Sequence, residues 1–280
     1  MKVDWEEIEE RVARMLCEAN TDLGRSQLDV MREKLAEEHD DRAKNTLNVL
    51  LENAKIAKEK QMALCQDTGM VVAFVEMGQD VKISGGFLGD AIESGVRRAY
   101  KEGYFRKSVV NAVTRENTKD NTPAVIHYDL VPESRLKITL LVKGFGSENM
   151  SRTFMLKPSE GMQGVERVVL QAVKEAGSNP CPPIVVGVGV GGTFEKAATM
   201  SKHALAREVG SNNPKASLDQ YEKEWVNKMN QFDIGPLGFG GNTTAFAVHI
   251  EDYPTHIAGL PVAVNINCHS IRHRSWEWRT

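Results

Sequence analysis

Apolar residues recur at helical spacing through the first part of the chain. Trp5, Ile8 and Val12 lie three or four positions apart, with acidic and basic residues between them. This spacing is typical of a helix that buries one face, and it returns twice more before residue 60. We therefore expect a helical N-terminal layer over about residues 1–60.

Beyond that layer, short apolar runs alternate with helical patterns. The runs are rich in Val, Ile and Leu and are bounded by turn-forming residues, which is typical of buried strands. They cover residues 70–75, 136–142, 184–190, 245–250 and 261–266, and residues 124–130 also read as extended. We expect the last two runs to close the chain. The alternation predicts an α/β fold with mixed β-sheets flanked by helices, in a single domain over residues 1–280.

Composition is ordinary for a globular protein and argues against several functional classes. Hydrophobic residues make up 41% of the 280 residues and charged residues 26%, with a formal net charge of −3. A chain so close to neutral has no basic field to attract nucleic acid or an anionic membrane. No apolar run approaches the roughly 20 residues of a membrane helix, and the acidic N-terminus lacks the apolar core of a signal peptide. We expect a cytoplasmic protein that binds neither nucleic acid nor membrane.

The segment from Cys65 to Gly69 concentrates reactive groups at a helix-to-strand junction. It reads Cys-Gln-Asp-Thr-Gly, so a thiol, an amide, a carboxylate and a hydroxyl occupy consecutive positions. Such a polar cluster adds little to a core and is well suited to a site. A lone cysteine is nevertheless often a small buried apolar residue, so the interpretation depends on what other segments contribute.

Three cysteines share a pattern that the fourth lacks. Cys65, Cys181 and Cys268 each lie at the end of a strand-like segment, whereas Cys17 lies within the first helical pattern and is expected to be structural. Three thiolates are too few to complete a structural zinc tetrahedron. They would suit a [4Fe–4S] cluster that keeps one iron open. The alternative is three separately buried thiols.

A glycine pattern offers a different kind of site. Gly187, Gly189 and Gly192 form G-x-G-x-x-G between a strand and a helix, which is the context of dinucleotide binding. The second strand that should end in an acidic residue is missing, because the chain runs into another helix. The pattern therefore indicates either close packing of a strand against a helix or backbone N–H groups that approach an anion.

Two further polar residues suit a site for a small anion. Arg106 follows an aromatic residue after a helix end, where a guanidinium would hold a carboxylate through two parallel hydrogen bonds. The alternative is a surface arginine. His256 lies in a loop just before the strand that leads to Cys268, and its alternative is a solvated histidine.

Taken together, five motifs resemble those of one enzyme family. They are Cys65-Gln-Asp-Thr-Gly, Lys143-Gly-Phe-Gly-Ser-Glu-Asn, Asn179-Pro-Cys-Pro-Pro-Ile-Val-Val-Gly-Val-Gly, Gly235-Pro-Leu-Gly-Phe-Gly-Gly-Asn-Thr and Asn267-Cys-His-Ser. Over essentially its whole length the chain resembles class I, iron–sulfur-dependent fumarate hydratases. It is most similar to the α subunit of the two-subunit form, which corresponds to the N-terminal domain of the single-chain form. The α subunit of L(+)-tartrate dehydratase shares most of these motifs.

This resemblance implies a cofactor and most of a site, within one iron–sulfur hydro-lyase domain. The ligands of a [4Fe–4S] cluster are matched by Cys65, Cys181 and Cys268. Positions that contact substrate are matched by Gln66, Asp67, Arg106, Gly144 and Gly146, and which of the two glycines touches substrate is left open. The expected catalytic residues are Asp67 and His256. The segment around His256 favours fumarate over tartrate.

The resemblance also implies a partner. In the single-chain form a further C-terminal domain supplies the catalytic threonine, arginines and a lysine, and we expect another chain to supply them here. We therefore expect a separate β subunit, an α2β2 assembly and a small dicarboxylate substrate, with reversible hydration of fumarate to (S)-malate. Two alternatives stay open: the α subunit of an L(+)-tartrate dehydratase, and a non-catalytic iron–sulfur scaffold subunit.

Overall fold

The computed structural model describes residues 1–279, which divide into two compact units. Unit 1 consists of Met1–Leu23, Ala54–Phe145 and Arg272–Thr280, and unit 2 of Gly24–Asn53 and Gly146–Ile271. Each unit is thus built from segments that are far apart in the sequence, and the helix α3 (Asp41–Lys60) contributes residues to both. The expected single catalytic domain concerns both units together and stays a prediction.

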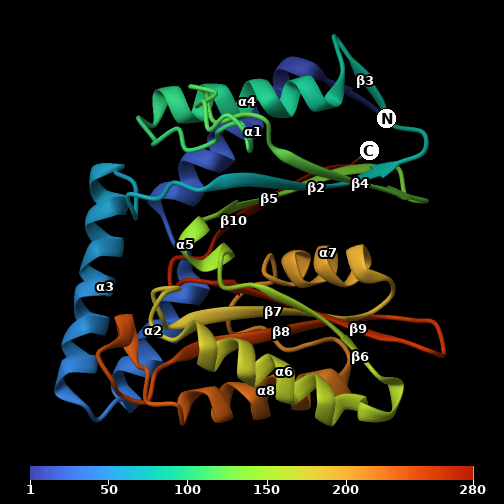
Figure 1. The fold of residues 1–280 in the computed structure, drawn as a ribbon. Helices are drawn as coiled ribbons and strands as arrows, with labels where there is room; N and C mark the ends of the chain where they lie inside the picture. The colour runs from blue at the N-terminus through green and yellow to red at the C-terminus, as the bar shows by residue number, and fades with distance from the viewer. Residues whose placement is uncertain (280) are drawn as a thin grey trace. The chain divides into compact units, whose positions relative to one another are not determined.

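Unit 1 contains a four-stranded sheet with the helices α1 and α4 on one face (Figure 1). The strand order is β10-β5-β2-β4, with β2 antiparallel to β5 and parallel to β4. Strands β1 and β3 form a separate parallel pair. In chain order the elements are β1 (Lys2–Asp4), α1 (Trp5–Thr21), β2 (Met70–Gly78), β3 (Lys82–Ser84), α4 (Leu88–Glu102), β4 (Val125–Val131), β5 (Arg135–Lys143) and β10 (Arg272–Arg279).

The core of unit 1 lies between this sheet and its helices. Val71, Ala73 and Val75 of β2 are almost completely buried in this core. They point to the same face of the sheet, because successive side chains of a strand point to opposite faces. Ile8 and Val12 of α1 belong to the same core and are fully buried. The amphipathic spacing at the start of the chain therefore marks the face that α1 buries.

Unit 2 contains a second four-stranded sheet, in the order β6-β9-β7-β8. The helices α6 and α8 cover one face, and α7 covers the other (Figure 1). Besides α2 (Arg25–Glu37), the elements are α5 (Phe145–Glu148), β6 (Arg152–Leu156), η1 (Pro158–Glu160), α6 (Gly161–Ala176), β7 (Ile184–Gly191), α7 (Phe194–Ala204), α8 (Ala216–Asn230), η2 (Pro236–Gly238), β8 (Ala245–Tyr253) and β9 (Leu260–Asn267).

The glycine pattern in β7 is explained by helix packing. Val186 and Val188 belong to the core that this sheet shares with α6 and α8. On the α7 side, a Cβ at Gly187 would lie 2.0 Å from the carbonyl oxygen of Ser201, and one at Gly189 would lie 2.1 Å from that of Ala197. Only glycine lets α7 approach the strand so closely. Close strand–helix packing therefore accounts for these two glycines without a nucleotide.

The predicted fold class is confirmed, but the strands β1, β3, β6 and β10 were not predicted. The expected strands are present as β2, β4, β5, β7, β8 and β9, and the first sixty residues form α1, α2 and α3 after the short β1. The expectation that residues 261–266 close the chain is wrong, because β10 follows and pairs antiparallel with β5. The side of β10 toward α1 carries Arg274, which donates to the carbonyl oxygen of Asp22 at 2.7 Å, and Trp278, which donates to Glu7 at 2.5 Å. No apolar alternation marks such a strand.

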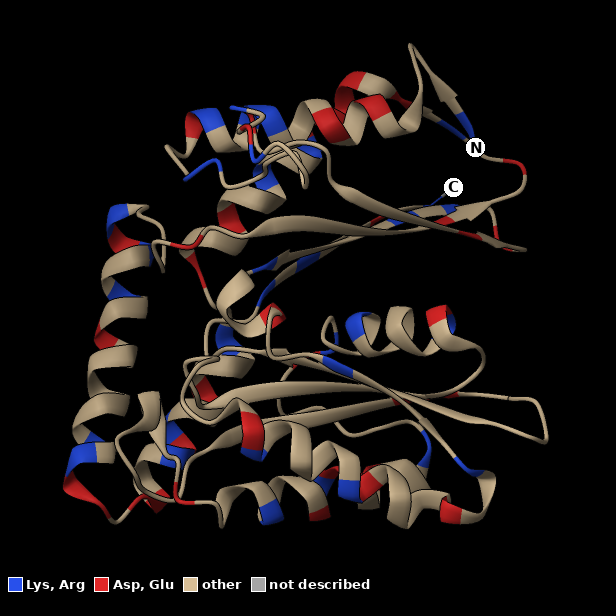
Figure 2. Cartoon of the chain, viewed as in Figure 1, with Lys and Arg blue, Asp and Glu red and all other residues tan. Residues whose placement is uncertain are grey.

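Charged residues are spread through both units. Figure 2 shows acidic and basic residues interspersed along α1 and α4 of unit 1 and along α6 and α8 of unit 2. Within residues 1–279, no helix combines the length and the apolar character that crossing a membrane requires.

Candidate functional site

The Cys65 loop (Cys65–Gly69) connects α3 to β2 in unit 1, and its exposure changes along its length. Cys65 is half-buried and Gln66 is exposed, whereas Thr68 and Gly69 are buried. Gly69 has φ +68°, and a Cβ there would lie 2.8 Å from the carbonyl oxygen of Lys143 in β5. The position therefore requires glycine. The end of the loop is fixed against the sheet, and its start presents the thiol and the amide outward.

The Asp67 carboxylate joins this loop to the predicted glycine-rich segment. Oδ1 accepts the backbone N–H of Gly69 at 2.9 Å, and Oδ2 accepts that of Phe145 at 2.8 Å. A Cβ at Gly144 would lie 3.1 Å from Asp67 Oδ2, so glycine leaves room for the carboxylate. The structure thus brings Asp67 and Gly144 together, although they are far apart in the sequence. Gly146, the other predicted glycine, belongs to unit 2.

Arg272, which sequence reasoning missed, supports the main chain of the same loop. Its side chain is 2% exposed, and Nη1 donates to the carbonyl oxygen of Asp67 at 2.8 Å and to Oδ1 of Asn20 at 3.1 Å. Asn20 is itself fully buried and donates to the carbonyl oxygen of Leu16 in α1 at 3.0 Å. Arg272 therefore anchors the Cys65 loop to α1. Its position shortly after Cys268 was the available signal, but the burial of an arginine is not readable from sequence.

Arg106 lies beside the Cys65 loop in the long connection between α4 and β4. The hydroxyl of Thr68 donates to the carbonyl oxygen of Arg106 at 2.9 Å, while the Arg106 side chain is exposed. The thiol of Cys65 donates to Oε1 of the neighbouring Gln66 at 3.3 Å. Unit 1 therefore holds a thiol, an amide, a carboxylate and a guanidinium-bearing segment on two loops that are hydrogen-bonded to each other.

Tyr100 fixes the buried end of the Cys65 loop from helix α4. Its hydroxyl donates to the carbonyl oxygens of Thr68 and Gly69, the latter at 3.1 Å. Its ring meets that of Phe105 edge to face, with centroids 5.6 Å apart. Burial raises the pKa of Tyr100 well above its usual range, so the hydroxyl stays protonated and remains a donor at neutral pH.

In unit 2, Cys181 and Cys268 lie on neighbouring segments. The backbone N–H of His269 donates to the carbonyl oxygen of Cys181 at 3.2 Å, which joins the segment after β9 to the one before β7. Cys181 is exposed and Cys268 is half-buried. Cys181 also has φ +54°, a left-handed conformation that is unfavourable for a residue with a Cβ. Such conformations persist where surrounding contacts enforce them, and they are frequent at functional positions.

The glycine-rich motif that begins at Gly235 supports the Cys181 segment. The backbone N–H of Leu237 donates to the carbonyl oxygen of Pro182 at 2.7 Å. The far end of the motif is held by Glu38, whose buried carboxylate accepts the backbone N–H of Asn242 and the hydroxyl of Thr243, each at 2.9 Å. Burial alone would raise the pKa of Glu38, but these hydrogen bonds and those from the following backbone N–H groups hold it below its ordinary value. This motif therefore acts as a support.

His256 lies apart from both cysteines of its unit. It sits on the exposed turn between β8 and β9, where Nδ1 accepts the backbone N–H of Ala258 at 3.2 Å and the side chain lines a hollow of about 280 Å³. Strand β9 separates it from Cys268 by the strand's full eight residues, which span more than about 20 Å. Unit 2 does not bring His256 beside Cys268, and its catalytic role stays a prediction.

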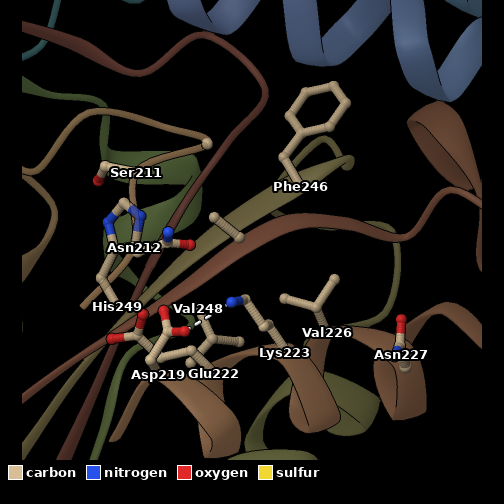
Figure 3. Close-up of a pocket in the computed structure, with 12 residues that line it drawn as sticks. Ser211, Asn212, Asp219, Glu222, Lys223, Val226, Asn227, Phe246, Val248 and His249 are labelled. Atoms are coloured by element: carbon tan, nitrogen blue, oxygen red, sulfur yellow. Dashed lines mark hydrogen bonds and ion pairs between the residues drawn. The ribbon is translucent and has the colours of Figure 1, made fainter. Parts of the chain in front are cut away.

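A further hollow of unit 2, about 380 Å³ in volume, follows the edge strand β8 (Figure 3). The ion pair of Asp219 and Lys223 lies on its α8 side, and Phe246 and His249 line it from β8. Two side chains bind backbone N–H groups along this strand. Asn230 accepts those of Thr244 and Ala245 at its start, and Glu222 accepts that of Ile250 within it. None of the predicted site residues lines it.

The predicted cluster cysteines are divided between the units, with Cys65 in unit 1 and Cys181 and Cys268 in unit 2. Within either unit alone, the described residues hold no group of three His, Cys, Asp or Glu side chains suited to a metal ion. The donor chemistry nevertheless fits, because all three thiols lie on loops and are at least partly exposed. Cys17 differs, since it packs against the unit 1 core and burial raises the pKa of its thiol.

Comparisons with known proteins agree on one assignment. A family model described as "Fumarate hydratase (Fumerase)" matches residues 9–277. The "Putative L(+)-tartrate dehydratase subunit alpha" of Methanocaldococcus jannaschii is 39% identical over 267 residues, which cover 93% of this chain and 94% of that protein. The "L(+)-tartrate dehydratase subunit alpha" of Escherichia coli K12 is 30% identical over 225 residues, which cover 79% of this chain and 74% of that protein.

Proposed function

Since the chain belongs to the fumarate hydratase family and is a hydro-lyase of the fumarase and tartrate dehydratase type, we propose that it catalyses the reversible hydration of fumarate to (S)-malate. The observation that carries this proposal is the cluster in unit 1, where Gln66 and Asp67 share a loop with Cys65 and that loop is hydrogen-bonded to the Arg106 segment. An amide and a carboxylate on one loop with a thiol, together with a guanidinium on the adjoining segment, suit a small dicarboxylate.

We propose that Cys65, Cys181 and Cys268 hold a [4Fe–4S] cluster with one iron that has no cysteine ligand. When bound, the cluster supplies a Lewis acid for the substrate. The support within this chain is that each thiol lies on a loop whose backbone is tied to a neighbouring segment. Arg272 holds the Cys65 loop through the Asp67 carbonyl, and His269 links the segments of the other two cysteines.

The polar residues of unit 1 bind and orient the substrate in this proposal. The Arg106 guanidinium binds a substrate carboxylate through two parallel hydrogen bonds, as its planar fork allows. Gln66 orients the substrate with its exposed amide. Asp67 holds the Gly144 segment in place through its two N–H donors. The remaining lone pairs of its carboxylate accept a proton or a polar group of the substrate.

The proton next to the leaving hydroxyl is weakly acidic, so its removal needs a positioned base. We propose that this base comes from a β subunit in an α2β2 assembly. The support is the name of the relatives, which are each called a "subunit alpha". His256, on its exposed turn, is the residue of this chain proposed to assist that proton transfer.

Dehydration of L(+)-tartrate is the second candidate reaction, and the names of the relatives favour it. The segment around His256 resembles fumarases and favours fumarate. Malate, the hydrated form of fumarate, differs from tartrate by one hydroxyl, and a site that hydrogen-bonds that hydroxyl discriminates strongly against the analogue that lacks it. The choice between the two reactions is therefore measurable in one preparation.

The test is an anaerobic assay of the chain together with its β subunit. We expect kcat/KM for fumarate hydration to exceed that for L(+)-tartrate dehydration by tenfold or more, about 1.4 kcal/mol or more of selectivity. The chain without the β subunit should be nearly inactive, and visible cluster absorbance should bleach in air. Tenfold preference for tartrate would establish the second candidate instead.

Substitution of Arg106 separates an enzyme from a scaffold subunit. Arg106→Lys should raise KM about tenfold, because an ammonium lacks the planar fork that binds a carboxylate through two hydrogen bonds. Arg115→Lys, an exposed arginine of the same connection, is the matched control and should leave KM unchanged. A cluster-bearing protein that tolerates Arg106→Lys, Gln66→Ala and Asp67→Asn without any loss would be a scaffold.

A further inference from the structure

A buried asparagine joins the two segments that carry the proposed substrate contacts. Asn121 is 0% exposed. Its Oδ1 accepts the backbone N–H of Ser108 at 2.7 Å and that of Val109 at 3.3 Å, and its Nδ2 donates to the carbonyl oxygen of Gly69 at 3.1 Å. One side-chain amide therefore links the residues that follow Arg106 to the end of the Cys65 loop.

The conformation of Asn121 explains why an asparagine occupies the position. Its φ is +65°, in the left-handed region that asparagine tolerates better than most residues with a Cβ. The side chain must accept on one side and donate on the other, and a side-chain amide carries an acceptor oxygen and a donor nitrogen on two separate atoms. An aspartate would set a carboxylate oxygen against the Gly69 carbonyl. A glycine would adopt the same backbone and make neither contact.

Two other hydrogen bonds act on the same pair of segments. The hydroxyl of Thr68 donates to the carbonyl oxygen of Arg106 at 2.9 Å, and Tyr100 donates to the Gly69 carbonyl that Asn121 also contacts, at 3.1 Å. The connection carrying Arg106 has contacts of its own, including a bridge between Val110 and Asn117. It would therefore keep local structure without Asn121 but lose its attachment to Gly69.

We infer that Asn121 is a positioning residue for substrate binding, which holds the backbone next to Arg106 at a fixed place relative to Gln66 and Asp67. This inference rests on the proposed function. When the attachment to Gly69 is lost, the Arg106 guanidinium samples more positions and contacts the substrate carboxylate in a smaller fraction of them. Because that contact is made equally in the ground state and the transition state, its loss raises KM more than it lowers kcat.

The test uses the complex with its β subunit and a double-mutant cycle. Asn121→Gly should raise KM for the dicarboxylate about tenfold, change kcat less than about threefold, and leave cluster absorbance per chain unchanged. In the Arg106→Lys background, Asn121→Gly should add almost no further rise in KM, because both substitutions weaken the same contact between residue 106 and the substrate carboxylate. Fully additive effects, or a KM that does not change, would overturn the inference.

Matched variants separate positioning from general stability. Asn117→Ala removes an exposed amide of the same connection, which donates to the carbonyl oxygen of Lys107 at 2.9 Å, and it should leave KM unchanged. If Asn121→Gly does not fold, Asn121→Asp keeps the acceptor for Ser108, loses the donor to Gly69 and sets a carboxylate oxygen against that carbonyl. It should show the same rise in KM, and a KM equal to that of the original complex would again contradict the inference.

Failure of the proposed function is distinguishable from failure of this inference. If the unmodified complex turns over neither fumarate nor tartrate, the proposed reaction fails. The Kd of succinate, measured by calorimetry on the same proteins, then tests Asn121 alone. A Kd that weakens about tenfold in Asn121→Gly and not in Asn117→Ala supports positioning, and an equal Kd in all three proteins refutes it.

Discussion

The two units hold their site segments by different means. In unit 1, the main chain of the Cys65 loop is held by side-chain hydrogen bonds. A backbone N–H or carbonyl of this loop is bound by each of Asp67, Asn121 and Arg272. In unit 2, backbone contacts dominate around Cys181, which has a left-handed φ and is bound through main-chain bonds from neighbouring loops. Unit 1 should therefore be sensitive to the removal of polar side chains. Unit 2 should be sensitive to substitutions that disturb backbone geometry.

The largest effect that this difference between the units predicts is that of Gly235→Ala in unit 2. Gly235 has φ +66°, and a Cβ would lie 1.7 Å from the carbonyl oxygen of Gly240, so the supporting motif must rearrange. We expect a loss of more than about 4 kcal/mol in the free energy of unfolding, measured by urea denaturation.

The control for this substitution is Gly177→Ala. Gly177 also has a positive φ, +54°, but a Cβ there would meet nothing within 4 Å. It should lose only about 1–3 kcal/mol, the strain of the positive φ alone. Equal losses for the two variants would mean that strain, and not the close contact, dominates in unit 2.

In unit 1 the corresponding test is Arg272→Met. Methionine fills part of the space but leaves the Asp67 carbonyl and Asn20 without their donor, and each buried unpaired group costs about 1–3 kcal/mol. We expect unfolding to become easier by about 2–3 kcal/mol and KM to rise, because the Cys65 loop loses its anchor. Arg279→Met, at a side chain that is 74% exposed, should change stability by less than about 0.5 kcal/mol. Similar effects at the two arginines would mean that Arg272 does not anchor the Cys65 loop.

The smallest expected effect is a pH dependence that comes from Glu38. Its pKa is lowered in the folded chain, so its contribution to stability is fully present above the ordinary glutamate pKa of about 4.3 and is lost as pH falls further. Glu38→Gln should cost about 1 kcal/mol at pH 7 and progressively less in more acidic solution. Urea denaturation from pH 7 to pH 3 measures this. Glu59→Gln, at an exposed glutamate, should leave the pH dependence as it was.

The regular elements were predictable where burial is apolar and periodic. Ile8 and Val12 in α1 and the valines of β7 show their buried faces in the sequence, because a helix and a strand repeat their side-chain directions at 3.6 and 2 residues. Strand β10 was missed for the opposite reason. Its side toward α1 uses Arg274 and Trp276, and Arg11 stacks over the Trp276 ring at 3.4 Å. Packing through hydrogen bonds and stacking leaves no periodic apolar pattern.

In the candidate site, residue types were predictable and their supports were not. Asp67 and Arg106 could be nominated because a carboxylate and a guanidinium have recognisable uses. Asn121 and Arg272 could not, because an asparagine in a polar connection and an arginine shortly before another arginine are usually solvated. Their importance comes from loop conformations that bring main-chain carbonyls to them, which neither composition nor periodicity encodes.

The order of the segments along the chain has a consequence for biosynthesis. Strand β5 pairs with β10, yet the main segment of unit 2 lies between them. At translation rates of about 5–20 residues per second, on the order of 10 s passes between the emergence of the two strands. During that interval β5 has an unpaired edge, and the Asp67 carbonyl lacks the guanidinium of Arg272. The Cys65 loop, although made early, is therefore completed only after the whole Gly146–Ile271 segment of unit 2 has been made.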